Sequence, residues 1–253
     1  MKILLSLLIN FLLIPSICFG GVSFDGIDDY LNCNSDTSLD NLYIYTVCAT
    51  FKIDTTPTGN FDIVSKYVSQ GSIPLEINNS KNIVSWWGAS SAGMLARSSN
   101  VISTNTWYKI CNTFDNTGDR KGRIYLNGIE VSYTTQANAS GTLESDSSNN
   151  LEIGRGVVSR YFDGIISDVA IWSSILSSQE ILQYGKSNVK RNALQLSPST
   201  LVAYWALNEH PDETSGDSDT FYDKSRNINN CTGSDGANNT GLTAKAEEIL
   251  SYP

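Results

Sequence analysis

The chain has 253 residues, with 26 acidic against 17 basic side chains and a formal net charge of -9. A chain this acidic lacks the basic surface that neutralises phosphates, so nucleic acid is not an expected partner. Hydrophobic residues make up 40% of the sequence and glycines number 19, a composition that indicates one packed domain of short strands. Any histidine-dependent catalytic or metal site would have to use His210, the single histidine, which stands in a polar, loop-like stretch.

Segment 1–20 has the three-part pattern of a secretory signal peptide. Lys2 precedes an almost wholly apolar run at 3–14, and small residues close the segment before Gly21. The pattern predicts cleavage before Gly21 and a secreted protein, extracellular or, in a bacterium, periplasmic or at the cell surface. A membrane anchor and a lipoprotein acylated on Cys18 are the alternatives. The apolar run is shorter than a bilayer requires, and no membrane span is expected in the mature chain.

Six segments after the leader have the alternation or the residue content of β-strands. In chain order they are 46–53, 107–115, 123–131, 151–154, 162–172 and 201–207. The third segment contains Asn127-Gly128, which predicts a tight hairpin because both residues tolerate a positive φ. Residues 177–184 are the one helical pattern, with Ser177 and Glu180 placed as a capping box.

Removal of the leader leaves four cysteines, an even number that predicts two disulfides in an exported chain. Cys48 and Cys111 each lie in a strand-like segment, on the side that carries the polar residues. A free cysteine usually behaves as a small buried hydrophobe, so two cysteines on polar faces of matching strands indicate a cross-strand bridge. We therefore expect Cys48–Cys111 and, by elimination, Cys33–Cys231. A thiolate metal site is disfavoured because the cysteines are far apart in the sequence.

The strand pattern predicts an all-β protein. Alternating strands bury one face only, so two sheets have to pack against each other to hide their apolar sides. The predicted core consists of Val47, Phe51, Ile110, Phe114, Ile171 and Trp205.

Longer motifs make the sequence similar to a known family. They occur in the order VSFDGIDDYL, TWYKICNTFD, GRIYLNGIEV, LEIGRG, FDGIISDVAIWSSILSSQEI and LVAYWALNE. The series resembles laminin-G-like jelly-roll domains, also called concanavalin A-like lectin/glucanase domains, and is nearest to the pentraxin-like group. This resemblance implies a two-sheet antiparallel β-sandwich with one short helix, spanning 21–241 and followed by a C-terminal tail at 242–253. The segments TVC and ICNTFD resemble the positions of the pentraxin-like disulfide, which agrees with the Cys48–Cys111 pairing.

The resemblance raises the question of calcium. Pentraxins hold calcium with acidic and amide residues, but the matching stretches here, 69–72 and 154–157, lack carboxylates. That calcium site, its phosphorylated ligands and the pentameric ring are therefore not expected. A separate structural calcium is conceivable, because this ion prefers oxygen ligands. The candidate ligands are Asp25, Asp28 and Asp168, together with the loop that contains Asp217, Asp219 and Asp223. The alternative is that these are turn aspartates bonded to their own backbone. No other cofactor is expected.

The same fold also hosts glycoside hydrolases, which need two carboxylates across the sugar bond. The candidate strand carboxylates each stand alone in their strands: Glu76, Glu130, Glu152 and Asp168. The one close pair, Glu144 and Asp146, lies in a loop-like stretch. We therefore expect a protein that is not an enzyme.

Exposed aromatic rings would favour sugar binding. Trp86 and Trp87 are adjacent, so in a strand they point to opposite faces, and Tyr161 and Phe162 follow a turn. These four residues are the candidate ligand-binding residues, although each is also a plausible core residue. The leading interpretation is a secreted, non-catalytic module that recognises a glycan or a surface protein. The alternatives are a structural or adhesion component of an envelope, appendage or virion and, in second place, a glycoside hydrolase.

Overall fold

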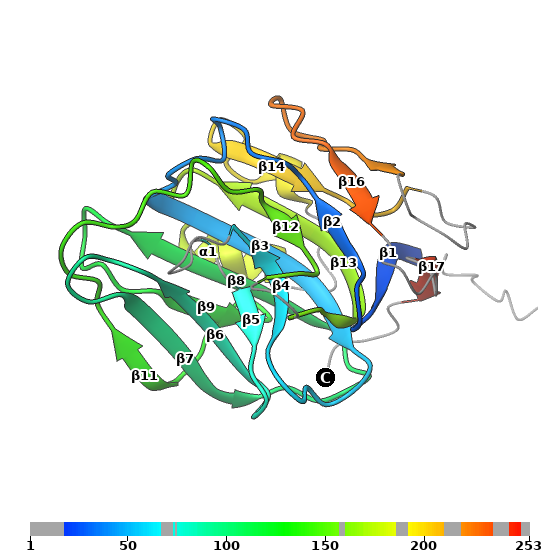
Figure 1. The fold of residues 1–253 in the computed structure, drawn as a ribbon, viewed down its shortest axis with the longest axis horizontal. Helices are drawn as coiled ribbons and strands as arrows, with labels where there is room; N and C mark the ends of the chain where they lie inside the picture. Colours follow the sequence, from blue (N-terminus) through cyan, green and yellow to red (C-terminus); the bar gives the residue numbers. More distant parts are fainter. Residues whose placement is uncertain are drawn as a thin grey trace, which may run out of the picture.

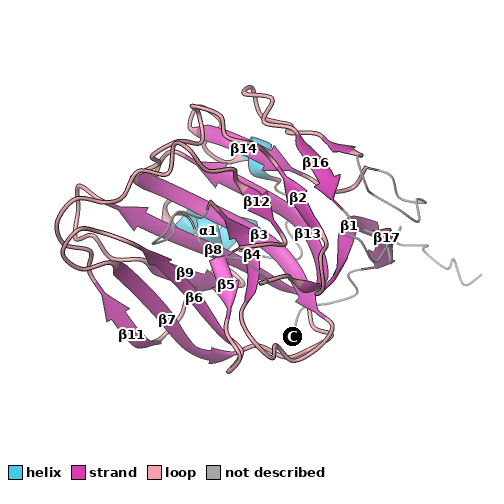
Figure 2. Cartoon of the chain, viewed as in Figure 1, coloured by secondary structure: helices cyan, strands magenta, loops and turns pink. Residues whose placement is uncertain are grey.

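The computed structural model describes residues 18–66, 73, 75–156, 160–185, 192–209, 219–234 and 243–248. Two antiparallel sheets lie face to face, with a single α-helix among the described residues (Figures 1 and 2). The predicted all-β sandwich with one short helix is confirmed.

The first sheet has eight strands in the order β10-β9-β8-β3-β13-β1-β17, with β14 paired to β13. Its strands are β1 (Cys18–Asp25), β3 (Ile44–Ile53), β8 (Tyr108–Asp115), β9 (Arg123–Leu126), β10 (Ile129–Glu130), β13 (Asp163–Trp172), β14 (Leu201–Trp205) and β17 (Thr243–Glu248).

The second sheet has nine strands in the order β11-β7-β6-β5-β4-β12-β2-β16-β15. They are β2 (Tyr30–Asn32), β4 (Phe61–Ser65), β5 (Leu75–Ile77), β6 (Asn82–Trp87), β7 (Met94–Val101), β11 (Tyr133–Ala137), β12 (Glu152–Ile153), β15 (Thr220–Phe221) and β16 (Cys231–Ser234).

The inner faces of the two sheets form the main core. All six predicted core residues are fully buried in it: Val47, Phe51, Ile110, Phe114, Ile171 and Trp205. A polar residue, Asn112, also lies on this face of β8. Its Oδ1 accepts hydrogen bonds from the hydroxyls of Tyr45 and Ser85, each at 2.9 Å. Both bonds satisfy the buried amide oxygen, and the bond from Ser85 of β6 connects the two sheets.

The outer face of the eight-stranded sheet is buried as well, which the sequence analysis did not foresee. Cys48 and Cys111 pair in register across β3 and β8, and they lie in a second apolar cluster with Ile181 and Tyr184 of α1 (Ser178–Gly185). The face that alternation indicates to be polar is therefore covered by the helix. The two predicted disulfides, Cys48–Cys111 and Cys33–Cys231, are both confirmed.

Local sequence signals account for α1 and for its contact with the hairpin at Asn127-Gly128. The Ser177 hydroxyl accepts a hydrogen bond from the Glu180 N–H, and the Ser177 N–H donates one to the Glu180 carboxylate, as a capping box requires. Asn127 and Gly128 have φ values of 51° and 83°, the left-handed conformation of the predicted hairpin. A Cβ on Gly128 would lie 2.9 Å from Leu182 Cα, so this glycine also permits close approach to α1. A 3-10 turn, η1 (Ala193–Gln195), follows the helix in sequence.

The first and last described strands, β1 and β17, pair in the eight-stranded sheet. The predicted cleavage point before Gly21 lies within β1, where Gly21 pairs with Lys245 of β17. Part of the expected tail, 243–248, thus forms a strand. Residues 1–17 lie outside the described residues, and the cleavage stays a prediction. None of the helices in the described ranges has the length and apolarity needed to cross a membrane.

Candidate functional site

A row of four side chains, three of them polar, crosses the outer face of the nine-stranded sheet. Asp62 of β4 lies opposite Glu76 of β5, Glu76 opposite Val84 of β6, and Val84 opposite Arg97 of β7. Leu75 and Ile77 lie in the core between the sheets, so Glu76, between them in β5, points to the outer face of the nine-stranded sheet. Helix α1 packs on the opposite side of the sandwich.

Glu76 is the centre of this row. Its carboxylate accepts hydrogen bonds from Asn60 Nδ2 at 3.0 Å and from Trp86 Nε1 at 3.4 Å. It also forms an ion pair of 3.1 Å with Arg160, whose side chain is about one third exposed. Trp86 is partly exposed. We call Asn60, Asp62, Glu76, Trp86, Arg97 and Arg160 the outer-face cluster.

Asp62 and Glu76 are both almost fully buried, at 2% and 4% exposure. Burial raises the pKa of Asp62 well above its usual value, and the charge of Glu76 raises it further, while Arg160 opposes the shift. Burial also raises the pKa of Glu76, against the effects of Arg160, Trp86 and Asn60. Asp62 Oδ2 has no hydrogen-bond partner among the described residues. The pair therefore holds a proton more tightly than two separate carboxyls would.

Sequence reasoning missed this carboxyl pair. It searched for acidic residues along single strands, whereas Asp62 and Glu76 face each other across two strands. The register of β4 against β5, with its bulge after Asp62, carries no local sequence signal. A cross-strand pair is chemically suited to acid-base catalysis, but both carboxyls are almost fully buried.

Tyr161 belongs to a neighbouring polar group. It is partly exposed and forms a β-bridge with Arg155. The Arg155 guanidinium pairs with Glu152 and stacks 3.3 Å from the centre of the Tyr30 ring. Two of the four predicted ligand-binding aromatics, Trp86 and Tyr161, therefore keep part of their side chains accessible.

The other two predicted aromatics lie in the core. Trp87 is fully buried and packs against Tyr43, Tyr45 and Phe114, with ring centres 5.7 to 5.8 Å apart. Phe162 is also fully buried. Neither ring has an exposed face on which a sugar could stack.

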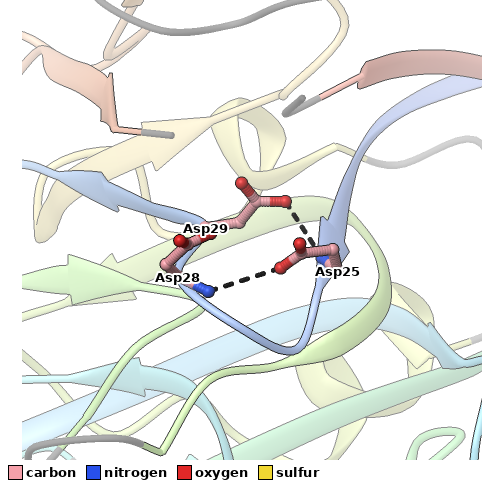
Figure 3. A group of neighbouring side chains, drawn as sticks. All are labelled: Asp25, Asp28 and Asp29. Carbon is pink, nitrogen blue, oxygen red and sulfur yellow. Dashed lines mark hydrogen bonds between the residues drawn. The ribbon is translucent and has the colours of Figure 1, made fainter. Parts of the chain in front are cut away.

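A second candidate is the acidic turn between β1 and β2. One oxygen each from Asp25, Asp28 and Asp29 lies within 4.8 Å of the others, the arrangement drawn in Figure 3. The Asp25 N–H donates to Asp29 Oδ2 at 2.9 Å, and the Asp28 N–H donates to Asp25 Oδ1 at 3.4 Å. Asp28 Oδ1 is buried without a hydrogen-bond partner among the described residues. The oxygens suit a hard cation such as calcium.

Asp168 is not part of this turn. It lies on β13, five positions beyond Asp163, which pairs with Asp25; at the usual strand rise that is roughly 16 Å away. Its carboxylate accepts a hydrogen bond from the Tyr184 hydroxyl of α1. Asp29, which the sequence analysis left out, lies with Asp25 and Asp28 in this turn.

Other polar candidates have structural roles or lie outside the described residues. Asp223 accepts backbone hydrogen bonds from Tyr204, Ser225 and Asn229 and thereby shapes a loop. His210, Asp217 and the stretch 69–72 lie outside the part of the chain that the structure describes.

Comparison with known proteins agrees with this architecture. The family model of the concanavalin A-like lectin/glucanases superfamily matches residues 25–182. The chain belongs to this superfamily. The match runs from the acidic turn through the outer-face cluster into the helix, so both candidate sites are within it. No curated protein matches the sequence significantly.

Two solved structures show the same superfamily fold. One is a candidate carbohydrate-binding protein from Bacteroides ovatus, 19% identical with a TM-score of 0.62, covering 86% of this chain and 58% of that one. This chain thus spans little more than half of that protein. The other is a heptameric SAP-like pentraxin from Limulus polyphemus, 17% identical with a TM-score of 0.52, covering 68% of this chain and 84% of that one. Identities this low establish the fold alone.

Proposed function

We propose that the protein is an exported, non-catalytic recognition domain that binds glycans on the outer face of its nine-stranded sheet. The observation that carries the proposal is the outer-face cluster, where the partly exposed Trp86 is fixed through its Nε1 to Glu76 beside Arg160 and Asn60. Sugar sites combine an aromatic surface with a few fixed polar groups, and this cluster supplies both. Tyr161 extends the aromatic surface nearby.

The absence of catalysis is part of the proposal. Asp62 and Glu76 form the carboxyl pair that hydrolysis would use, but both are buried and Glu76 is engaged by three neighbours. Export is supported by the two disulfides, which persist in oxidising compartments.

We also propose a structural calcium ion at the acidic turn. Asp25, Asp28 and Asp29 supply the oxygens, and the buried, unbonded Oδ1 of Asp28 is the atom that an ion would satisfy. The ion would hold the turn that leads from one sheet to the other and would take no part in chemistry.

A glycan array tests the main proposal. We expect selective binding that is lost in Trp86→Ala, because the variant removes the stacking surface, with at least a tenfold weaker affinity. Tyr222→Ala is the control, since Tyr222 is an aromatic residue 49% exposed on a different part of the surface. An array without any signal would contradict glycan binding and favour a structural or adhesion role.

A further inference from the structure

A fully buried lysine lies between two aspartates that come from distant parts of the chain. Lys66 directly follows β4, and its relative exposure is 0%. Its Nζ forms ion pairs with Asp40 and, at 3.3 Å, with Asp146, and it donates a hydrogen bond to the Leu39 carbonyl at 3.1 Å. We call Lys66, Asp40 and Asp146 the lysine cluster. It shares no residue with the outer-face cluster or with the acidic turn.

Reciprocal hydrogen bonds hold the two aspartates in place. Asp40 precedes β3, and Asp146 lies in the connection between β11 and β12. The Asn41 N–H donates to Asp146 Oδ1 at 2.7 Å, and the Asp146 N–H donates to Asn41 Oδ1 at 3.2 Å. Since Asn41 is the neighbour of Asp40, these bonds keep the two carboxyl groups close to the amine. The sequence analysis placed Asp146 in a loop-like stretch and did not foresee its burial.

The lysine cluster buries more negative than positive charge. The side chains of Lys66 and Asp146 are fully buried and that of Asp40 is 16% exposed, so one ammonium group faces two carboxylates. Burial of charges that are not fully compensated is unfavourable. Transfer of one proton from Lys66 to a carboxylate removes two of the three charges. It also leaves an amine in contact with a carboxylic acid, the two groups that condense to an amide.

We propose that Lys66 and Asp40 are joined by an isopeptide bond and that Asp146 transfers the proton that this reaction requires. The Lys66 amine attacks Asp40 Cγ and forms the N–C bond. Asp146 takes the surplus proton from the nitrogen and passes it to the departing hydroxyl, which leaves as water when the C–O bond breaks. One ammonium and one carboxylate thus give one amide and one water, without a change of oxidation state. Groups held in reacting geometry reach effective concentrations of about 10⁵ M or more, so the fold itself promotes the step.

The exposure of the two aspartates distinguishes their roles. The released water has to reach the solvent, and Asp40 is the partly exposed partner of Lys66. Asp146 is fully buried, and its Oδ1 accepts hydrogen bonds from the Asn41 N–H and from Lys66 Nζ. These donors stabilise the negative charge of Asp146 and orient the carboxylate that accepts the proton.

The bond would connect the two sheets of the sandwich. Asp40 lies in the loop that leads into β3 of the eight-stranded sheet, and Lys66 follows β4 of the nine-stranded sheet. Each disulfide, by contrast, joins neighbouring strands within one sheet: β3 to β8 for Cys48–Cys111, and β2 to β16 for Cys33–Cys231, in which Cys33 directly follows β2. An amide between Lys66 and Asp40 would also persist when the disulfides are reduced.

Mass spectrometry of the full chain tests the proposal without any ligand, so its outcome is independent of the proposed function. After reduction and alkylation of the cysteines, the protein should be lighter than its sequence by the mass of one water molecule. Trypsin should fail to cut after Lys66, and fragmentation of the branched peptide should place the link at Asp40. A mass equal to that of the sequence, with cleavage after Lys66, would overturn the proposal, and a link at Asp146 would overturn the assigned roles.

Replacement of the lysine locates the loss of water. Lys66→Arg should have the full sequence mass, because the guanidinium keeps the positive charge but does not condense with a carboxyl group. Lys52→Arg is the matched control, since Lys52 pairs with Asp54 at 3.7 Å in a partly exposed position, and it should keep the loss of one water. A loss that persists in Lys66→Arg would come from another part of the chain and would overturn the proposal.

Asp146→Asn tests the proton transfer. The amide cannot take a proton from the amine, so the fraction of bonded protein should fall at least tenfold. Circular dichroism shows whether the variant keeps its β structure, and the mass of the parent protein decides the bond itself if it does not. Asp36→Asn, at an exposed position, should leave the bonded fraction unchanged. Equal bonded fractions in Asp146→Asn and in the parent would overturn the role of Asp146.

Discussion

Asp62 makes the stability of the domain depend on pH. Its carboxyl is buried with an unbonded oxygen, and its pKa is raised by burial and by Glu76. A carboxyl whose pKa is higher in the folded than in the unfolded protein favours folding at low pH. That contribution is lost as the pH rises from the unfolded value, near 4, through the folded one.

We therefore expect Asp62→Asn to stabilise the protein at pH 7 and above, by about 1 to 3 kcal/mol, because the amide carries no charge to bury. Near pH 4 the variant and the parent should unfold at similar denaturant concentrations. Asp36→Asn is the control, since Asp36 is exposed and a hydrogen bond from the Ser38 backbone lowers its pKa. A parent and variant with parallel pH profiles would disprove the assignment.

The two adjacent tryptophans show what the alternation of side chains along a strand can predict and what it cannot. Adjacent tryptophans in a strand have to face opposite sides, and Trp86 and Trp87 do so, one partly exposed and one in the core. Alternation does not show which residues of other strands a side chain contacts. The contact of Trp86 with Glu76 depends on the pairing of β6 with β5, which brings together residues 10 positions apart.

Among the elements, helix α1 and the Cys48–Cys111 disulfide beneath it form one packed unit. Cys48 and Cys111 were expected on polar faces, and the pairing inferred from that placement was right although the face is buried. The alternation of β3 and β8 could not show that α1 returns to cover their outer side, because this depends on where the chain goes after β13. The capping box and the hairpin are local signals, so both could be predicted.

Removal of the Cys48–Cys111 bridge should loosen this unit. The bridge closes a loop of 63 positions, and the double variant Cys48→Ala, Cys111→Ala should lose about 4 kcal/mol of stability by the chain-entropy model. Hydrogen exchange should show faster exchange of the α1 amides, because the bridge is part of the cluster on which the helix packs.

The double variant Cys33→Ala, Cys231→Ala is the matched comparison. Its bridge closes a longer loop, with a separation of 198, so the same model gives a loss of about 5 kcal/mol. Exchange should then increase at β2 and β16, which that bridge joins, while α1 stays protected. Identical exchange patterns in the two double variants would show that α1 does not depend on the Cys48–Cys111 bridge.

At the scale of the whole molecule, the order of motifs predicted the fold because each motif combines strand alternation with a turn at a fixed place. The family match at residues 25–182 covers most of these motifs. The candidate site was predicted less completely. The residues of the outer-face cluster come from β4 to β7, from Asn60 before β4 and from Arg160. The sequence analysis listed no strands for β4 to β7.

The acidic turn links the two sheets, since β1 belongs to one and β2 to the other. An ion bound to Asp25, Asp28 and Asp29 in the folded protein alone would stabilise the whole sandwich, by about 2.7 kcal/mol at a hundredfold excess over its dissociation constant.

We expect millimolar calcium to raise the melting temperature by several degrees over protein in a chelator. Magnesium should be less effective, because it demands a tighter octahedral site. Asp28→Asn should abolish the calcium shift, and Asp36→Asn, a substitution in another Asp turn, should preserve it. Equal melting temperatures in calcium and in chelator would exclude the ion and leave these aspartates as turn residues bonded to their own backbone.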